Sequence, residues 1–299
     1  MDRRAWMTMA GAWTLSAPTW AAPGQSLGTP RAAAAAKPRL AVVLGGGSAR
    51  GFAHIGVIKA LEAAGLAPDL IVGCSAGALV GAFWAYGYSG KAMELLAYEV
   101  DDRAVIDLVT PASGSRRGMI SGQSLQNFVN SGVRGRTMSG LRTPLITVAT
   151  EFPSGVLKEF SSGDVGFAVR ASCSIPGIFL PAELDGQEYL DGGLVSPIPV
   201  QTARAAGATL VVAVDVGAED PSGVAGKRAT GGIYELILRS FEIMGKSLRL
   251  NESRLADVVI RPDVGRISSS DFAARRSLIE AGFKAGERLA PVIKAKLAR

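Results

Sequence analysis

Short runs of apolar residues alternate along this chain with longer stretches in which apolar positions recur every three or four residues. Continuous apolar runs predict strands that are buried on both faces, as in a parallel sheet. We predict such strands at 40–44, 70–72, 145–149, 209–216 and 256–261. The longer stretches predict helices at 52–64, 76–85, 91–100, 121–129, 165–172, 200–206 and beyond 233, with Ser121 as the N-cap of the fourth. The alternation predicts one α/β domain with a mainly parallel central sheet.

The first 38 residues do not follow this alternation. Arg3 and Arg4 precede a moderately apolar stretch that ends in small residues, an arrangement similar to a twin-arginine export signal. We expect residues 1–22 to be a signal peptide, 23–38 a linker, and 39–299 the folded domain. Export to the periplasm or the medium is therefore expected. The alternative is a cytoplasmic protein with a disordered leader, or with a start codon assigned too early.

The strand at 70–72 runs directly into Gly73-Cys74-Ser75-Ala76-Gly77, and a predicted helix follows. A Gly-x-Ser-x-Gly string between a strand and a helix is typical of the nucleophile elbow, a strained turn that exposes a serine hydroxyl. Gly73 and Gly77 leave open the space that a Cβ would fill. The helix directs the positive end of its dipole at the same place. Taken alone, the pattern also fits an ordinary turn of small residues.

A glycine-rich loop, Gly45-Gly46-Gly47-Ser48-Ala49-Arg50-Gly51, connects the strand at 40–44 to the helix at 52–64. Consecutive glycines leave backbone N–H groups that can converge on an anion, either a phosphate or the oxyanion of a tetrahedral intermediate. The loop lacks the Gly-Lys-Ser/Thr of a P-loop and fits the dinucleotide-binding pattern poorly. The sequence therefore favours an oxyanion hole over a phosphate site.

Composition narrows the choice of a catalytic base. The chain has a single histidine, His54, and it lies early in the sequence. In α/β-hydrolases the histidine of the triad comes last in the chain, so a Ser-His-Asp triad is not expected. We expect His54 to be a core or helix-surface residue, which leaves a carboxylate as the candidate base.

Charge and cysteine content exclude other classes of site. The formal net charge of +6 comes from basic residues that are spread along the chain, so no nucleic-acid partner is expected. Mild attraction to an anionic membrane surface is equally consistent with this charge.

Cys74 and Cys173 make neither a disulfide framework nor a zinc site. No run approaches the roughly 20 apolar residues of a membrane span.

Two further segments carry candidate chemistry. Residues 174–181 form an apolar loop fixed by prolines, which fits core packing and the wall of an acyl-chain cleft equally well. Asp191 is followed by Gly192 and Gly193. Such a turn is often purely structural, but the two glycines also allow another backbone to approach and hold the carboxylate rigidly.

Together these motifs resemble the patatin-like phospholipase family, in the order in which the family has them: the glycine-rich loop, the elbow, the Ile-Pro-Gly of 171–179, and Asp-Gly-Gly. The resemblance covers the chain from about residue 40 to its C-terminus. It implies a three-layer α/β/α fold and a Ser–Asp dyad without histidine. By matching position, Ser75 is the nucleophile and Asp191 the base. The implied oxyanion donors are Gly46, Gly47 and Ser48, with Arg50 as the basic residue of that loop.

The expected function is hydrolysis of lipid carboxylic esters, with phospholipid or lysophospholipid as substrate. We expect this hydrolysis to require no metal or organic cofactor. Two alternatives stay open: a phosphate- or nucleotide-binding α/β module in which Ser75 is incidental, and a scaffold or regulator that retains the site without turnover.

Overall fold

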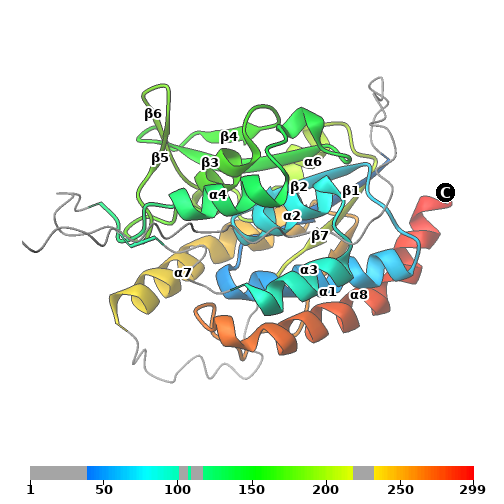
Figure 1. Ribbon diagram of the computed structural model, residues 1–299. Helices are drawn as coiled ribbons and strands as arrows, with labels where there is room; N and C mark the ends of the chain where they lie inside the picture. The colour runs from blue at the N-terminus through cyan, green and yellow to red at the C-terminus, as the bar shows by residue number, and fades with distance from the viewer. Residues whose placement is uncertain (1–38, 101–106, 109–116, 218–231) are drawn as a thin grey trace, which may run out of the picture.

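The computed structural model describes residues 39–100, 107–108, 117–217 and 232–299. The predicted signal peptide and linker lie outside these residues. The described part folds around one eight-stranded sheet with the strand order β5-β6-β3-β2-β1-β7-β8, and β4 pairs separately with β3. Helices cover both faces of this sheet, so the predicted three-layer α/β/α fold is confirmed (Figure 1).

The parallel core of the sheet consists of the strands that the apolar runs predict. These are β1 (Leu40–Leu44), β2 (Leu70–Cys74), β3 (Leu145–Phe152), β7 (Leu210–Val214) and β8 (Val258–Ile260). These five strands pair with one another in parallel. Every residue of β1, β2 and β7 is buried, which is why their sequences are continuously apolar.

One edge of the sheet is antiparallel, and the sequence did not predict it. It comprises β4 (Leu157–Phe160), β5 (Ala182–Leu184) and β6 (Gln187–Asp191). These strands are short and partly exposed, so they lack the continuous apolar run that marks a buried strand. The consequence for function is that β6 ends on Asp191, beside the middle of β3.

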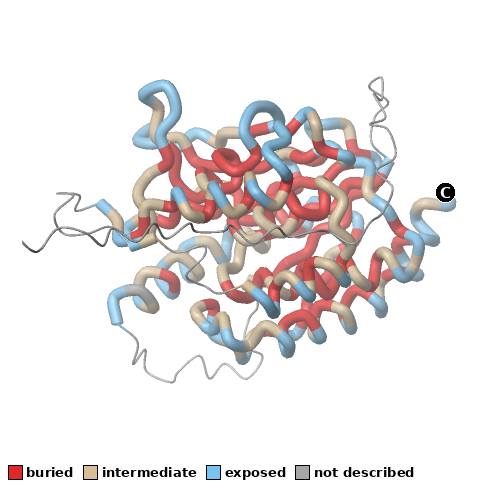
Figure 2. The backbone as a smooth tube through the Cα atoms, in the orientation of Figure 1, coloured by how far each residue is buried: buried red, intermediate tan, exposed pale blue. Residues whose placement is uncertain are grey.

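Two apolar clusters pack on opposite faces of the sheet, because successive side chains of a strand point to opposite sides. On the face of Val42 and Leu44 lie α1 (Phe52–Ala63), α2 (Ala76–Tyr86), α5 (Val165–Ser172) and α8 (Arg275–Leu297). On the face of Ala41 and Val43 lies α6 (Val200–Ala205). The buried residues follow the sheet and the inner sides of these helices (Figure 2).

Three further helices complete the described part: α3 (Gly90–Glu99), α4 (Gln123–Gly132) and α7 (Ile233–Ser253). The expectation that Ser121 caps α4 is wrong, since the N-cap is Gly122, in the left-handed region at φ 80°. The Asp107 carboxylate accepts the N–H of Gly122 (2.9 Å) and of Ser124 (3.1 Å), and it also accepts the Ser121 hydroxyl. Asp107, which lies outside the helix, therefore caps it, and the Ser121 hydroxyl additionally accepts the Gln123 N–H at 3.2 Å.

Candidate active site

Ser75 occupies the single residue between β2 and α2, and its backbone is strained. Its φ of 51° and ψ of −123° lie where side chains are rarely found. A Cβ at Gly77 would come within 2.1 Å of the Leu44 carbonyl oxygen, and one at Gly73 within 2.6 Å of the Ala78 Cα. Neither position can accept a side chain without displacing backbone. The elbow geometry expected from Gly-x-Ser-x-Gly is therefore present.

Asp191 is buried, with 1% of its surface exposed, at the end of β6. Its Oδ1 accepts the Gly193 N–H at 2.7 Å, while its Oδ2 has no hydrogen-bond partner among the described residues. Burial raises the pKa of Asp191 to about 7, against smaller lowering effects from the Gly193 N–H and the Ser75 side chain. The Ser75 side chain thus lies close enough to favour the charged carboxylate, and the structure brings the two residues together.

The end of α5 holds both residues in place, which the sequence did not indicate. The Ser172 hydroxyl accepts the Ser75 N–H at 2.8 Å and donates to the Val148 carbonyl at 2.6 Å. Two residues on, the Ser174 carbonyl accepts the Asp191 N–H at 2.9 Å. The short segment 172–174 therefore connects the strained turn to the end of β6. Buried serines of this kind carry no recognisable sequence signal.

The glycine-rich loop lies against Ser75, since a Cβ at Gly46 would stand 3.5 Å from the Ser75 Cβ. The Gly46 N–H does not face the site freely, because it donates to the Pro197 carbonyl at 2.9 Å. Among the described residues the N–H groups of Gly47 and Ser48 have no hydrogen-bond acceptor. Ser48 has a φ of 49°, in the left-handed region. Of the three expected backbone donors, these two are free to bind an anion.

Arg50 is engaged away from the loop. Its Nε donates to the Ile267 carbonyl at 2.7 Å, and its guanidinium pairs with Glu242 of α7 at 3.2 Å. Only 5% of the residue is exposed, and burial lowers the pKa of its guanidinium. In this arrangement Arg50 connects the glycine-rich loop to α7.

The histidine lies beneath the same loop and has no access to solvent. The His54 Nε2–H donates to the Gly45 carbonyl at 2.8 Å, and burial lowers the pKa of the ring to about 4. At neutral pH the buried ring is therefore uncharged, and its hydrogen bond to the Gly45 carbonyl holds the first residue of the glycine-rich loop. His54 is thus a core residue, one of the two places that we expected for it.

A buried carboxylate from α7 fixes the segment that follows the Asp191 turn. Glu252 accepts the Ser196 hydroxyl and, at 2.8 Å, the Ile198 N–H. Burial raises the pKa of Glu252 to about 7. Between these two donors lies Pro197, whose carbonyl accepts the Gly46 N–H. Glu252 therefore positions the glycine-rich loop indirectly, by holding the residues on both sides of Pro197. Only the folded structure reveals this role.

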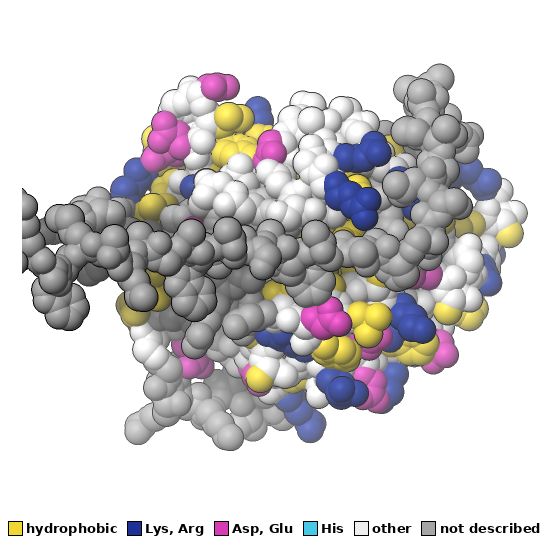
Figure 3. All heavy atoms as spheres, viewed as in Figure 1, with side chains coloured by type: hydrophobic (Ala, Val, Ile, Leu, Met, Phe, Trp, Pro, Cys, Tyr) yellow, Lys and Arg dark blue, Asp and Glu magenta, His cyan; other side chains and the backbone are white. Residues whose placement is uncertain are grey.

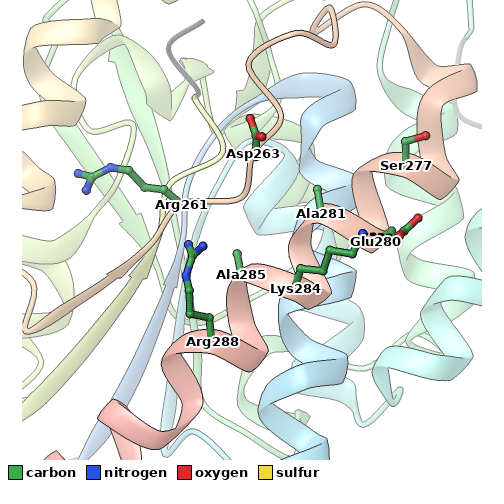
Figure 4. A pocket seen from close by; sticks show the side chains of 8 residues that line it. All are labelled: Arg261, Asp263, Ser277, Glu280, Ala281, Lys284, Ala285 and Arg288. Carbon is green, nitrogen blue, oxygen red and sulfur yellow. Dashed lines mark hydrogen bonds and ion pairs between the residues drawn. The ribbon is translucent and has the colours of Figure 1, made fainter. Parts of the chain in front are cut away.

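Other features of the described residues have no connection to this chemistry. No group of His, Cys, Asp and Glu there could hold a metal ion, and none of the helices there is both long and apolar enough to cross a bilayer. A hollow of about 370 Å³ lies between α8 and the segment after β8, lined by charges of both signs (Figure 4). None of its lining residues belongs to the motifs of the sequence.

Lys and Arg side chains are scattered among Asp and Glu on the face shown in Figure 3.

Comparison with known proteins finds relatives of this chain. The family model for patatin-like phospholipases matches residues 42–204. "Patatin-like phospholipase domain-containing protein 6" of Mus musculus is 32% identical over 238 residues, which are 77% of this chain and 16% of that protein. An uncharacterized NTE family protein of Mycobacterium tuberculosis is 35% identical over 62% of this chain and 51% of its own length. This chain thus corresponds to only a part of these curated relatives.

Among solved structures, VipD from Legionella pneumophila is similar with a TM-score of 0.47 and 16% sequence identity. The similarity covers 86% of this chain and 67% of that one.

Proposed function

This chain belongs to the patatin-like phospholipase family, and on that premise we propose that it is a serine acyl hydrolase of lipid carboxylic esters. The proposed substrates are phospholipids or lysophospholipids. The observation that carries the proposal is a strained Ser75 whose side chain influences the pKa of a buried Asp191, together with an Asp191 Oδ2 that has no hydrogen-bond partner among the described residues. A carboxylate with a pKa near 7 is a far better base for a hydroxyl than one with an ordinary pKa.

In the first step the Asp191 carboxylate takes the proton of the Ser75 hydroxyl while the Ser75 Oγ forms a bond to the ester carbonyl carbon. The electron pair of the carbonyl moves to its oxygen. The N–H groups of Gly47 and Ser48, with the N-terminal end of α2, stabilise this oxyanion. One such donor supplies about 3–4 kcal/mol of transition-state stabilisation in enzymes where it has been removed.

In the second step the oxyanion reforms the carbonyl and the bond to the leaving alcohol breaks. Asp191 returns its proton to the leaving oxygen, so that an acyl-enzyme on Ser75 and a neutral alcohol result. Water then attacks the acyl-enzyme with Asp191 again as base, which releases the fatty acid and restores the serine. The cycle needs no group beyond these residues and water.

The test is hydrolysis by Ser75→Ala and Asp191→Asn, measured on a soluble p-nitrophenyl ester and on a panel of phospholipid, lysophospholipid and neutral ester. We expect both variants to lose activity by at least about a thousand-fold, as removal of a nucleophile or its base does in other hydrolases. The surface substitutions Ser131→Ala and Asp263→Asn serve as matched controls and should retain activity. Full activity in either site variant rejects the dyad.

The hydrolysis assay, together with fluorophosphonate labelling, distinguishes the alternative functions. A phosphate-binding module gives no ester hydrolysis in the wild-type protein, and its Ser75 does not react with a fluorophosphonate. A scaffold that retains the site can bind lipid but does not turn it over. A family-typical hydrolase forms an acyl adduct on Ser75 and releases fatty acid.

A further inference from the structure

The outer face of α7 exposes a row of large apolar side chains. Ile233, Leu236, Ile243 and Met244 are 62%, 55%, 65% and 64% exposed, and Leu248 is 37% exposed. Their spacing places them on one side of the helix, opposite the buried Leu238. The N-terminal end of α7 projects from the left of the molecule in Figure 1, and much of its surface is exposed in Figure 2. We call these five residues the outer face of α7.

The inner side of the same helix contacts both halves of the active site. The Phe241 ring packs against Gly193, where a Cβ would stand 3.0 Å from the ring. Glu242 pairs with Arg50 of the glycine-rich loop, and Glu252 holds the segment that follows Gly193. Whatever binds the outer face is therefore one helix diameter, about 10 Å, from the catalytic turn.

The charges on α7 indicate what kind of surface this face fits. The exposed charged side chains along the described part of the helix are basic, Arg239 and Lys246, and the Arg239 guanidinium also pairs with the half-buried Glu242 at 3.1 Å. Its acidic residues, Glu235, Glu242 and Glu252, are partly or fully buried. An amphipathic helix with apolar side chains on one face and basic residues beside them is typical of helices that lie in the headgroup region of a bilayer.

We propose that the outer face of α7 docks on the surface of an anionic phospholipid bilayer and brings the active site to its substrate. The proposal rests on the proposed function, since it places the site of a lipid hydrolase beside the lipid. The chain's net charge of +6 adds attraction to such a surface. A second copy of the chain fits less well, because a stable dimer uses about 20–30 residues on each side and the outer face offers five.

The experiment measures binding separately from catalysis. Ser75→Ala, with or without Ile243→Gln and Met244→Gln, is sedimented with vesicles made of equal parts phosphatidylcholine and phosphatidylserine. Glutamine keeps the helix propensity and removes the apolar surface. We expect the double substitution to lower vesicle affinity by at least about ten-fold. Leu95→Gln on α3 and Val292→Gln on α8, at exposed apolar positions outside α7, should leave the affinity unchanged.

A second readout uses the active protein with the same substitutions. The ratio of fatty-acid release from vesicles to hydrolysis of a soluble p-nitrophenyl ester should fall by the same factor in the α7 variant only. If vesicle affinity is equal with and without Ile243→Gln and Met244→Gln, the docking proposal is overturned, even where ester hydrolysis is normal. If the wild-type protein sediments with vesicles through α7 but hydrolyses no ester, the docking stands and the proposed function fails. A wild-type dimer that the α7 variant converts to a monomer assigns the face to a second copy and overturns the proposal.

Discussion

Replacement of Asp191 by asparagine should abolish hydrolysis and at the same time stabilise the protein at neutral and alkaline pH. The side chains have the same shape, and an asparagine Oδ1 can still accept the Gly193 N–H that Asp191 accepts at 2.7 Å. The Oδ2 of Asp191 has no partner among the described residues, so no hydrogen bond of the folded state is lost there. What the substitution removes is the cost of a buried negative charge.

The size of this cost follows from the raised pKa of Asp191. In the unfolded chain the carboxyl loses its proton near its ordinary pKa of 3.8, whereas in the folded protein it keeps the proton up to about 7. Between these values the unfolded state binds fewer protons, so the free energy of unfolding falls by about 1.4 kcal/mol for each unit of rising pH. Across the whole window the wild-type protein loses about 4 kcal/mol of stability that the Asn variant keeps.

The assay is urea unfolding of wild-type protein and Asp191→Asn at a series of pH values from about 4 to 8. Other groups titrate in the same window, Glu252 among them, but they contribute equally to both proteins and cancel in the difference. We expect the stability difference in favour of the variant to grow as pH rises and to level off above about pH 7. In the wild-type protein, kcat/KM for a soluble ester should rise over the same interval, because the base must be unprotonated.

A stability difference that does not change with pH contradicts this reasoning, because it means that Asp191 ionises equally well in the folded and unfolded states. If the wild-type protein instead becomes more stable than Asp191→Asn as pH rises, the reasoning is contradicted as well, because the charged Asp191 then stabilises the folded state. An activity profile with a midpoint near pH 4 would separately show that the base is an ordinary, solvated carboxylate.

Three further outcomes follow from the site. Ser172→Ala removes the acceptor of the Ser75 N–H and leaves that buried donor without a hydrogen bond, which costs about 1–3 kcal/mol of stability. We expect kcat to fall roughly ten-fold with little change in KM. Gly77→Ala places a Cβ 2.1 Å from the Leu44 carbonyl oxygen, and thermal unfolding should show a much less stable protein or none that folds. His54→Gln should retain ester hydrolysis, because the ring at that position is a buried support and not a base; loss of turnover in a folded variant would refute that role.

The parallel core of the fold was predictable because local sequence determines it. Strands buried on both faces need continuous apolar residues, and this requirement alone located β1, β2 and β7. The elbow was predictable for a similar reason, since only glycine fits at Gly73 and Gly77. The antiparallel edge was missed because β4 and β5 are short and half-exposed, and their pairing depends on turns rather than on apolar content.

The site could be predicted only in part, because long-range contacts set its details. Ser75 and Asp191 were identified by their motifs, but only the fold brings them together. The orientation of the Gly46 N–H depends on Pro197, far along the chain, and the place of Arg50 depends on Glu242. No local pattern encodes such pairings. The sequence therefore predicts four groups for the oxyanion hole, whereas among the described residues only two of its backbone donors, the N–H groups of Gly47 and Ser48, lack an acceptor.

The most direct test of the account is the mass of the protein after reaction with a fluorophosphonate or a slow p-nitrophenyl ester, followed by peptide mapping of the adduct. The central claim is that Ser75 forms a covalent acyl-enzyme with Asp191 as its base. We predict one adduct on the peptide that carries Ser75, absent in Ser75→Ala and formed much more slowly in Asp191→Asn. An adduct on another residue, or ester hydrolysis at the wild-type rate in a protein without the Ser75 hydroxyl, would contradict it.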